Sequence, residues 1–233
     1  MWHSYFHRIE NKYQMRISLN KELVIRIDGR NITKNKNISL LEKKANNFVD
    51  CFEETVKILT NKYKCLCCFG SDEASFIFDE PKILLEELNI DTERNARTND
   101  IVALFTQEFY DCFNNLYKNE KIYWHGACFS IEKEKVKSYL KFRTTIIKNV
   151  MTTYFLKRMM IKDAGSIKMS ERIAQNEGYD SYKKVKEMEN GILYLNGDRI
   201  DLDEFLNDNI MKIEVKKTKA EDEFFDITKW DIE

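Results

Sequence analysis

Apolar residues along this chain follow two different spacings, and each spacing predicts one kind of element. Short apolar runs rich in Val, Ile, Phe and Cys are typical of strands, and they occupy residues 22–27, 64–69, 74–78 and 121–131. Apolar residues three or four positions apart are typical of amphipathic helices, and they occupy residues 5–15, 39–59, 99–116 and 133–160. A short helix is also expected between residues 83 and 88.

In sequence order the long segments are helix, strand, helix, strand, strand, helix, strand, helix. This order contains a β-α-β-β-α-β unit, which folds as a ferredoxin-like antiparallel sheet with helices on one face. We therefore predict an α+β domain over residues 1–161. Residues 162–233 are expected to form a small C-terminal α/β appendage packed on it, with a helix at 166–176 and strands at 191–195 and 211–217.

The composition narrows the classes of partner. The chain has 233 residues, of which 43% are apolar, and this is enough to build a core. Its 38 Lys and Arg nearly balance its 39 Asp and Glu, so the formal net charge of -1 gives no overall attraction to nucleic acid or to an anionic membrane. Any contact with RNA must therefore use a local basic patch.

The cysteines and the hydropathy pattern indicate a reducing compartment. The six Cys lack the paired spacing and His partners of a structural zinc site, and three of them lie inside the apolar run at 64–69, as buried free thiols do. The chain opens without a signal-peptide pattern, and no apolar stretch approaches the roughly 18 residues that span a bilayer. We expect a cytoplasmic protein without a membrane partner.

Acidic residues stand at the ends of two predicted strands. Asp28 follows the first strand and is followed by Gly29, while Asp72 and Glu73 occupy the turn of the predicted hairpin. Either group alone is typical of an ordinary turn. Together, with one helix between them, they have the spacing of a β-α-β-β polymerase-type palm, in which two carboxylates meet at one edge of the sheet.

Such a pair of carboxylates suits magnesium. Mg²⁺ prefers carboxylate and carbonyl oxygen and takes its remaining ligands from water and substrate phosphates, and two such ions clamp the attacking and leaving oxygens of a phosphoryl transfer. Asp28, Asp72 and Glu73 are therefore the candidate catalytic residues. Gly29 is a candidate metal ligand through its carbonyl, because no Cβ obstructs a close approach of its backbone.

Two motifs carry a resemblance to a known family. Val24-Ile-Arg-Ile-Asp-Gly-Arg-Asn31 and Gly70-Ser-Asp-Glu-Ala-Ser-Phe-Ile-Phe78 resemble the two acidic motifs of the tRNA-His guanylyltransferase family of 3′-to-5′ RNA polymerases. Weaker similarity covers residues 8–19, 124–129 and 136–143 and extends toward the C-terminus. The resemblance implies a polymerase-palm fold, 5′-end activation of tRNA or a related RNA by ATP or GTP, and nucleotide addition.

The resemblance also implies roles for single residues. Asp28 and Asp72 would bridge two Mg²⁺ ions, the Gly29 carbonyl would complete a metal shell, and Glu73 would assist beside them. The residues implied to line the triphosphate are Arg30, Asn31 and Ser71. Lys34, Arg143 and Lys168 are further candidate phosphate-binding cations. A homotetramer or homodimer is expected, and within the family a 5′-end repair activity is favoured over a dedicated tRNA-His activity.

Several positions depart from the family pattern. Ile32 to Asn35 lack its aromatic residue and His, and the segment after Arg143 lacks its Gln and acidic residue. His125 and Ala127 stand where the family has Asp and Arg. A single His beside a Trp in a strand more often packs than reacts, so His125 is kept only as a possible substrate contact.

Two other functions remain open at this point. A nucleotidyl cyclase or another small-nucleotide enzyme needs the same two carboxylates on the same palm. An inactive RNA-binding or scaffold homologue is the third reading, suggested by the altered segments. Metal-dependent binding or turnover of a nucleoside triphosphate would argue against the inactive form.

Overall fold

A computed structural model gives the arrangement of the chain. The structure describes residues 15–30, 32, 45–91, 96–118, 121–158 and 190–207, with the backbone alone at 45–47 and 151–158. The strands are β1 (Glu22–Gly29), β2 (Leu66–Gly70), β3 (Glu73–Phe78), β4 (Trp124–Ile131), β5 (Ile192–Leu195) and β6 (Asp198–Ile200). The helices are α2 (Ala45–Tyr63), α3 (Pro81–Glu87), α4 (Thr98–Leu116), α5 (Val136–Arg158) and α8 (Leu202–Asn207), with a 3-10 turn η2 (Lys133–Lys135) before α5.

The six strands form one antiparallel sheet in the order β4-β1-β3-β2-β5-β6. β3 lies between β1 and β2, and β1 lies between β3 and β4, so two split β-α-β units interleave in the ferredoxin-like manner. The predicted α+β fold with an antiparallel palm-type sheet is confirmed. The predicted strands and helices between residues 22 and 158 are all present, with boundaries shifted by a few residues.

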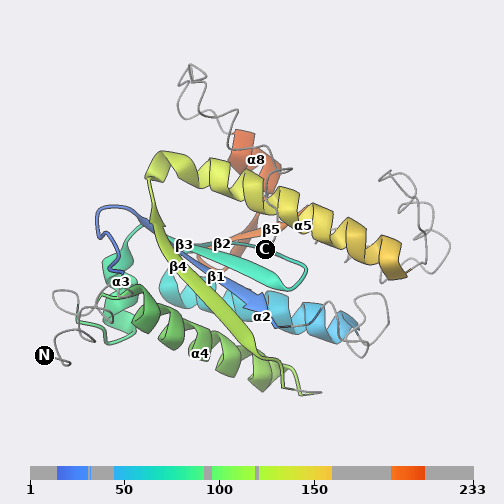
Figure 1. The fold of residues 1–233 in the computed structure, drawn as a ribbon, viewed down its shortest axis with the longest axis horizontal. Coiled ribbons are helices and arrows are strands. Elements are labelled where there is room, and N and C mark those ends of the chain that lie inside the picture. Colours follow the sequence, from blue (N-terminus) through green and yellow to red (C-terminus); the bar gives the residue numbers. More distant parts are fainter. Residues whose placement is uncertain are drawn as a thin grey trace, which may run out of the picture.

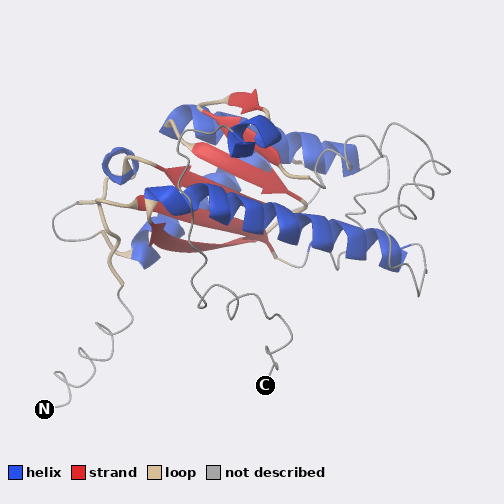
Figure 2. Ribbon diagram, turned by 90° about the horizontal axis from the view of Figure 1, so that it is seen from above, coloured by secondary structure: helices blue, strands red, loops and turns tan. Residues whose placement is uncertain are grey.

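Helices cover both faces of this sheet (Figure 1). α2 and α4 lie on one face, and α5 crosses the other. From above, α5 lies over the strands (Figure 2). Helices were predicted on one face only. α5 adds a layer on the other face because its buried side is partly polar and meets the polar face of the sheet. Tyr139 and Arg143 of α5 both bond to side chains of β3.

The α2 and α4 face holds the main aromatic core. In β1 the side chains of Leu23, Ile25 and Ile27 alternate with those of Arg26 and Asp28, so one strand serves both faces. The core face is filled by rings from both helices and the sheet, including Phe52, Phe69, Phe76, Phe105, Phe109, Phe113 and Trp124. This packing fixes the strands whose other face carries the acids.

Residues 190–207 extend the same sheet. β5 pairs with β2, and Asn196 and Gly197, both with positive φ, form a two-residue turn into β6. The expected strand at 191–195 is confirmed, whereas β6 and α8 were not predicted, because three and six residues give too short a pattern. The helix at 166–176, the strand at 211–217 and most of the helix at 5–15 fall outside the described residues.

No helix in the described part of the chain is long and apolar enough to cross a membrane. The boundary between a domain of residues 1–161 and an appendage of residues 162–233 stays a prediction. β5 and β6 nevertheless belong to the same sheet as the other four strands.

Candidate functional site

The end of β1 and the start of β3 meet at one edge of the sheet. Asp28 and Glu73 are direct partners in the antiparallel register, so their side chains leave the same face. The Gly29 amide donates a hydrogen bond of 2.8 Å to the Asp72 carbonyl oxygen. Three acidic residues from two separate sequence motifs are thereby brought together, and we refer to Asp28, Asp72 and Glu73 as the acidic edge.

The turn between β2 and β3 is held in an unusual conformation. Ser71 has a φ of 57°, a left-handed value that costs a non-glycine residue about 1 kcal/mol or more, and it is 1% exposed. Its hydroxyl donates a 2.9 Å hydrogen bond to Oδ1 of Asp72. The turn therefore adopts an unfavourable backbone conformation that orients the Asp72 carboxylate.

The environment of Asp72 disfavours its ionised form. Asp72 is 8% exposed, and burial, followed by the nearby charge of Asp28, raises the pKa of its carboxyl to about 6, although the Ser71 hydroxyl opposes the shift. Asp28 is only partly buried. Two carboxylates in close electrostatic contact, one of them hard to ionise without a cation, form the donor set that a divalent ion satisfies.

Gly29 is needed for space. A Cβ at this position would lie 2.0 Å from Cδ1 of Ile32 and 3.1 Å from the Trp124 ring. Both neighbours are buried. Its φ is not in the left-handed region, so the close approach of Ile32 and Trp124, rather than a special turn, requires glycine here.

Glu73 and Arg143 form a buried ion pair. Nε of Arg143 donates to Oε1 of Glu73 at 3.0 Å, and Nη2 donates to Oε2, so the pair is bidentate. Arg143 is 4% exposed and Glu73 9%. Burial works against the charge of Arg143, but the Glu73 carboxylate outweighs it and raises the pKa of Arg143. A predicted catalytic acid and a predicted phosphate ligand thus bind each other.

Arg26 is a cation on the same face that was not among the predicted site residues. It lies two residues before Asp28 on β1, opposite Ser75 of β3, whose hydroxyl is 3.0 Å from the Tyr139 hydroxyl. Arg26 is half-buried, and its charge acts on the nearby Tyr139 hydroxyl. The available signal was its i+2 spacing from Asp28, which places both side chains on one face of a strand.

β4 supplies the outer border of the site. His125 pairs in register with Asp28, is exposed and shares its face, while Ala127 stands opposite Arg26. The Arg30 amide donates to the Tyr123 carbonyl oxygen at 2.8 Å, and the Arg30 side chain is exposed. His125 and Arg30 therefore lie at the open side of the acidic edge, where a substrate could reach them.

Three predicted nucleotide ligands, Asn31, Lys34 and Lys168, fall outside the described residues. Among the described residues, the structure brings Asp28, Gly29, Ser71, Asp72, Glu73 and Arg143 together.

The donors present fit a magnesium site of the substrate-completed kind. Within the described ranges, no three His, Cys, Asp or Glu residues cluster as a self-sufficient metal site. Asp28 and Asp72 provide two carboxylates, and Mg²⁺ is commonly held by one or two carboxylates plus waters and substrate phosphates. The acidic edge therefore suits an ion that arrives with a polyphosphate.

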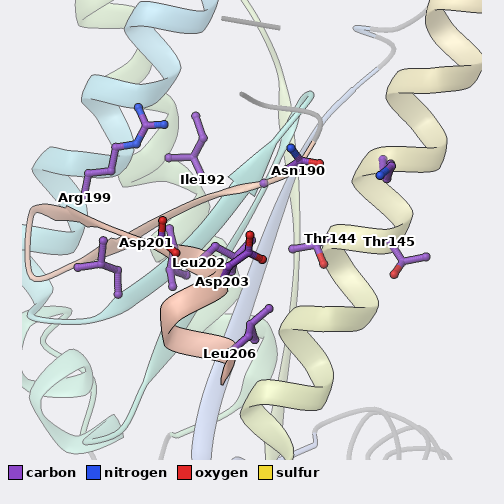
Figure 3. Close-up of a pocket in the computed structure, with 13 residues that line it drawn as sticks. Thr144, Thr145, Asn190, Ile192, Arg199, Asp201, Leu202, Asp203 and Leu206 are labelled. Atoms are coloured by element: carbon purple, nitrogen blue, oxygen red, sulfur yellow. The ribbon is translucent and has the colours of Figure 1, made fainter. Parts of the chain in front are cut away.

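A pocket of ≈ 650 Å³ lies between α5 and the segments around β5, β6 and α8 (Figure 3). Thr144 and Thr145 line its α5 side, and Asp201, Asp203 and Leu206 lie across from them. Arg143, the residue before Thr144, bonds to Glu73, but neither of these two residues lines the pocket. The lining mixes both signs of charge with aliphatic side chains.

Comparisons with known proteins agree with this fold. The structure resembles a bacterial tRNA(His) guanylyltransferase (Thg1)-like protein in complex with ATP, with a TM-score of 0.58 and 16% identity over 82% of this chain and 83% of that one. A bacterial protein of the same description in complex with GTP gives a TM-score of 0.57 and 15% identity, with the same two coverages.

The tRNA(His) guanylyltransferase of Saccharomyces cerevisiae gives a TM-score of 0.54 and 20% identity over 83% of this chain and 93% of that one. No family model and no curated protein matches the sequence. The chain has the fold of tRNA-His guanylyltransferase-like proteins, as the two acidic motifs predicted.

Proposed function

We propose that this protein is a nucleotidyltransferase that adds nucleotides in the 3′-to-5′ direction to the 5′ end of tRNA or a related RNA, with Mg²⁺. The observation that carries the proposal is the acidic edge, where Gly29 bonds to Asp72 and the charge of Asp28 acts on the Asp72 carboxyl. The likeness of the whole fold to guanylyltransferase-like proteins supports it.

The proposed reaction has two balanced steps. First, a 5′-phosphate oxygen of the RNA attacks the α-phosphorus of ATP or GTP, forms a new P–O–P bond and expels pyrophosphate. Then the 3′-hydroxyl oxygen of an incoming nucleoside triphosphate attacks the activated 5′-phosphorus, forms a phosphodiester and expels the nucleoside monophosphate, and its proton passes to solvent. Each step is a phosphoryl transfer, which depends mainly on positioning and charge neutralisation.

The residues of the acidic edge divide this work. Asp28, Asp72 and the Gly29 carbonyl would hold two Mg²⁺ ions, which when bound neutralise charge on the transferring phosphate. Ser71 orients the Asp72 carboxylate through its hydroxyl. Arg30, which is exposed beside Gly29, would line the triphosphate, together with Asn31, Lys34 and Lys168. We further propose a cytoplasmic homotetramer or homodimer that repairs 5′ ends.

The test uses a 5′-truncated tRNA, labelled ATP and GTP, and MgCl₂. Asp28→Asn and Asp72→Asn should each lower nucleotide addition by about 10³-fold or more, because the chemistry needs both carboxylates. Asp100→Asn is the matched control, since Asp100 is an exposed carboxylate in the first turn of α4 on the other face of the sheet, and its rate should stay at the wild-type value.

Product analysis separates the competing functions. Formation of a cyclic nucleotide without RNA would replace the proposal with a cyclase. Full addition activity in both Asn variants would show that the acidic edge is not the active site. RNA binding with no triphosphate turnover in the wild-type protein would favour the inactive homologue.

A further inference from the structure

The Glu73–Arg143 ion pair lies directly beside the two proposed metal ligands. We propose that Arg143 is a positioning residue that holds Glu73 away from the metal position, so that Asp28 and Asp72 provide the carboxylates there. This assignment rests on the proposed function, and it differs from direct roles for Glu73 at the metal and for Arg143 at the triphosphate.

The ion pair uses both carboxylate oxygens of Glu73 and two nitrogens of Arg143. Each Glu73 carboxylate oxygen accepts from a different nitrogen of the Arg143 guanidinium, in the planar arrangement that suits this side chain. Both residues are more than nine-tenths buried. A direct contact of either one with a metal or a phosphate would have to use the lone pairs or N–H groups outside this pair, which burial shields, and breaking the pair would leave a buried charge unpaired.

The position of Glu73 explains why such a partner is needed. Glu73 faces the same side of the sheet as Asp28, its partner in register, and directly follows Asp72. Without a cation, three like charges would gather at one strand end and repel one another. Arg143 compensates one of them permanently and leaves a pair of carboxylates for the ion that comes with the substrate.

α5 holds the guanidinium in this place. Tyr139, one turn before Arg143, is hydrogen-bonded to Ser75 at 3.0 Å, and Ile147, one turn after it, is 1% exposed. Residues four apart lie on the same side of a helix, so this stripe anchors α5 to the polar face of the sheet on both sides of Arg143. The helix therefore presents Arg143 as a fixed element of the site.

A double-mutant cycle tests the assignment, with Mn²⁺ binding followed by electron paramagnetic resonance and nucleotide addition followed on the same full-length proteins. Arg143→Met leaves the Glu73 carboxylate uncompensated, and Glu73→Gln leaves the Arg143 cation uncompensated beside Asp28. Each single variant should change the Mn²⁺ dissociation constant and kcat by roughly tenfold or more. Glu73→Gln/Arg143→Met, which removes both charges, should return both quantities to within about threefold of wild type.

Other outcomes would overturn the assignment. If Glu73 is a metal ligand, the double variant will bind Mn²⁺ as weakly as Glu73→Gln. If Arg143 binds the triphosphate, the double variant will keep the raised KM of Arg143→Met. Should the single variants fail to fold, the charge-neutral double variant decides alone: folded with near-wild-type Mn²⁺ binding, it supports the proposal, and folded with weak binding, it refutes it.

A control pair exists away from the acidic edge. Lys21, just before β1, and Glu132, just after β4, form an exposed salt bridge, and Lys21→Met/Glu132→Gln should change neither metal binding nor kcat. The Mn²⁺ measurement needs no RNA, so a failed coupling refutes the Arg143 assignment. A failure of RNA addition in the wild-type protein refutes the proposed function instead.

Discussion

The two faces of the central sheet use the same strands for opposite purposes. Toward α2 and α4, the strands bury Ile25, Phe76 and their neighbours in contact with aromatic rings. Toward α5, Asp28 and Glu73 stand side by side. Burial of apolar side chains on the first face stabilises the fold. The second face brings like charges together in a partly buried environment, which is unfavourable. The difference indicates that the aromatic face supplies the stability that an electrostatically unfavourable site requires.

The largest effect is expected from a substitution that weakens the aromatic face. Phe109 is 0% exposed, and its ring centroid lies 4.8 Å from that of Trp124 and 5.7 Å from that of Phe52. Phe109→Ala should lower the free energy of unfolding by about 3 to 5 kcal/mol, measured by urea denaturation, because it removes a buried ring and leaves a cavity.

Leu104→Ala is the control on the same helix. Leu104 is 45% exposed, and its removal should change the free energy of unfolding by less than about 1 kcal/mol. Equal losses for Phe109→Ala and Leu104→Ala would contradict the claim that the aromatic face carries the stability of the fold.

The aromatic face was also the part that the sequence predicted best. Helical spacing of Phe105, Phe109 and Leu116 predicted α4, and the β-branched run before Asp28 predicted β1. Both elements are buried on one side, and this burial produces a regular spacing of apolar residues in the sequence. α5 carries a weaker pattern, since its buried side includes Tyr139 and Arg143. Its extent was predicted, but its place on the acid face was not.

The acidic edge was predictable as a set of positions and not as a set of contacts. The strand ends placed Asp28 near Asp72, because residues at neighbouring strand ends meet at one edge. The pairing of Glu73 with Arg143 spans 70 positions in the chain and leaves no local pattern. Arg26 was missed for a related reason, since a charged residue inside an apolar run looks like a solvated side chain until the opposite face is known.

Neutralising Asp72 should stabilise the protein, because it removes a charge from the polar face of the sheet. The pKa of Asp72 is raised to about 6, mainly by burial and then by Asp28. The neutral form is therefore favoured in the folded protein: its stabilising contribution is fully present below the ordinary carboxyl pKa and is lost as the pH rises through about 6. In EDTA at pH 8, Asp72→Asn should raise the free energy of unfolding by about 2 to 3 kcal/mol.

The pH series provides the internal check. The gain from Asp72→Asn should shrink toward zero near pH 4, where Asp72 is protonated in the folded wild-type protein. Asp100→Asn, at an exposed carboxylate in the first turn of α4 on the other side of the sheet, should give a difference of no more than about 1 kcal/mol, the size of a carboxylate's interaction with the helix dipole. A gain that is independent of pH would show that desolvation of the Asp72 charge is not its cause.

A smaller effect is expected at Gly29, the last residue of β1. Gly29→Ala would place its Cβ 2.0 Å from Cδ1 of the buried Ile32, so it should destabilise the protein by about 1 to 3 kcal/mol through overpacking. Adding Ile32→Val removes the clashing methyl group and should recover most of the loss in thermal melting. If the double variant is no more stable than Gly29→Ala, contact with Ile32 is not why glycine is required.

The smallest effect concerns Ser71, where the polar face uses backbone energy to orient a carboxylate. Ser71→Ala loses the hydroxyl that donates to Asp72 and keeps the left-handed φ of 57°, while Ser71→Gly loses the same hydroxyl and relieves the backbone. The free energy of unfolding of Ser71→Gly should therefore be about 1 kcal/mol higher than that of Ser71→Ala. Both variants should add nucleotides more slowly than wild type, because Asp72 loses its orienting donor and its pKa rises further. Equal stability of the two variants would mean that the turn carries no strain, and the contrast between a stabilising face and a strained one would then rest on charge alone.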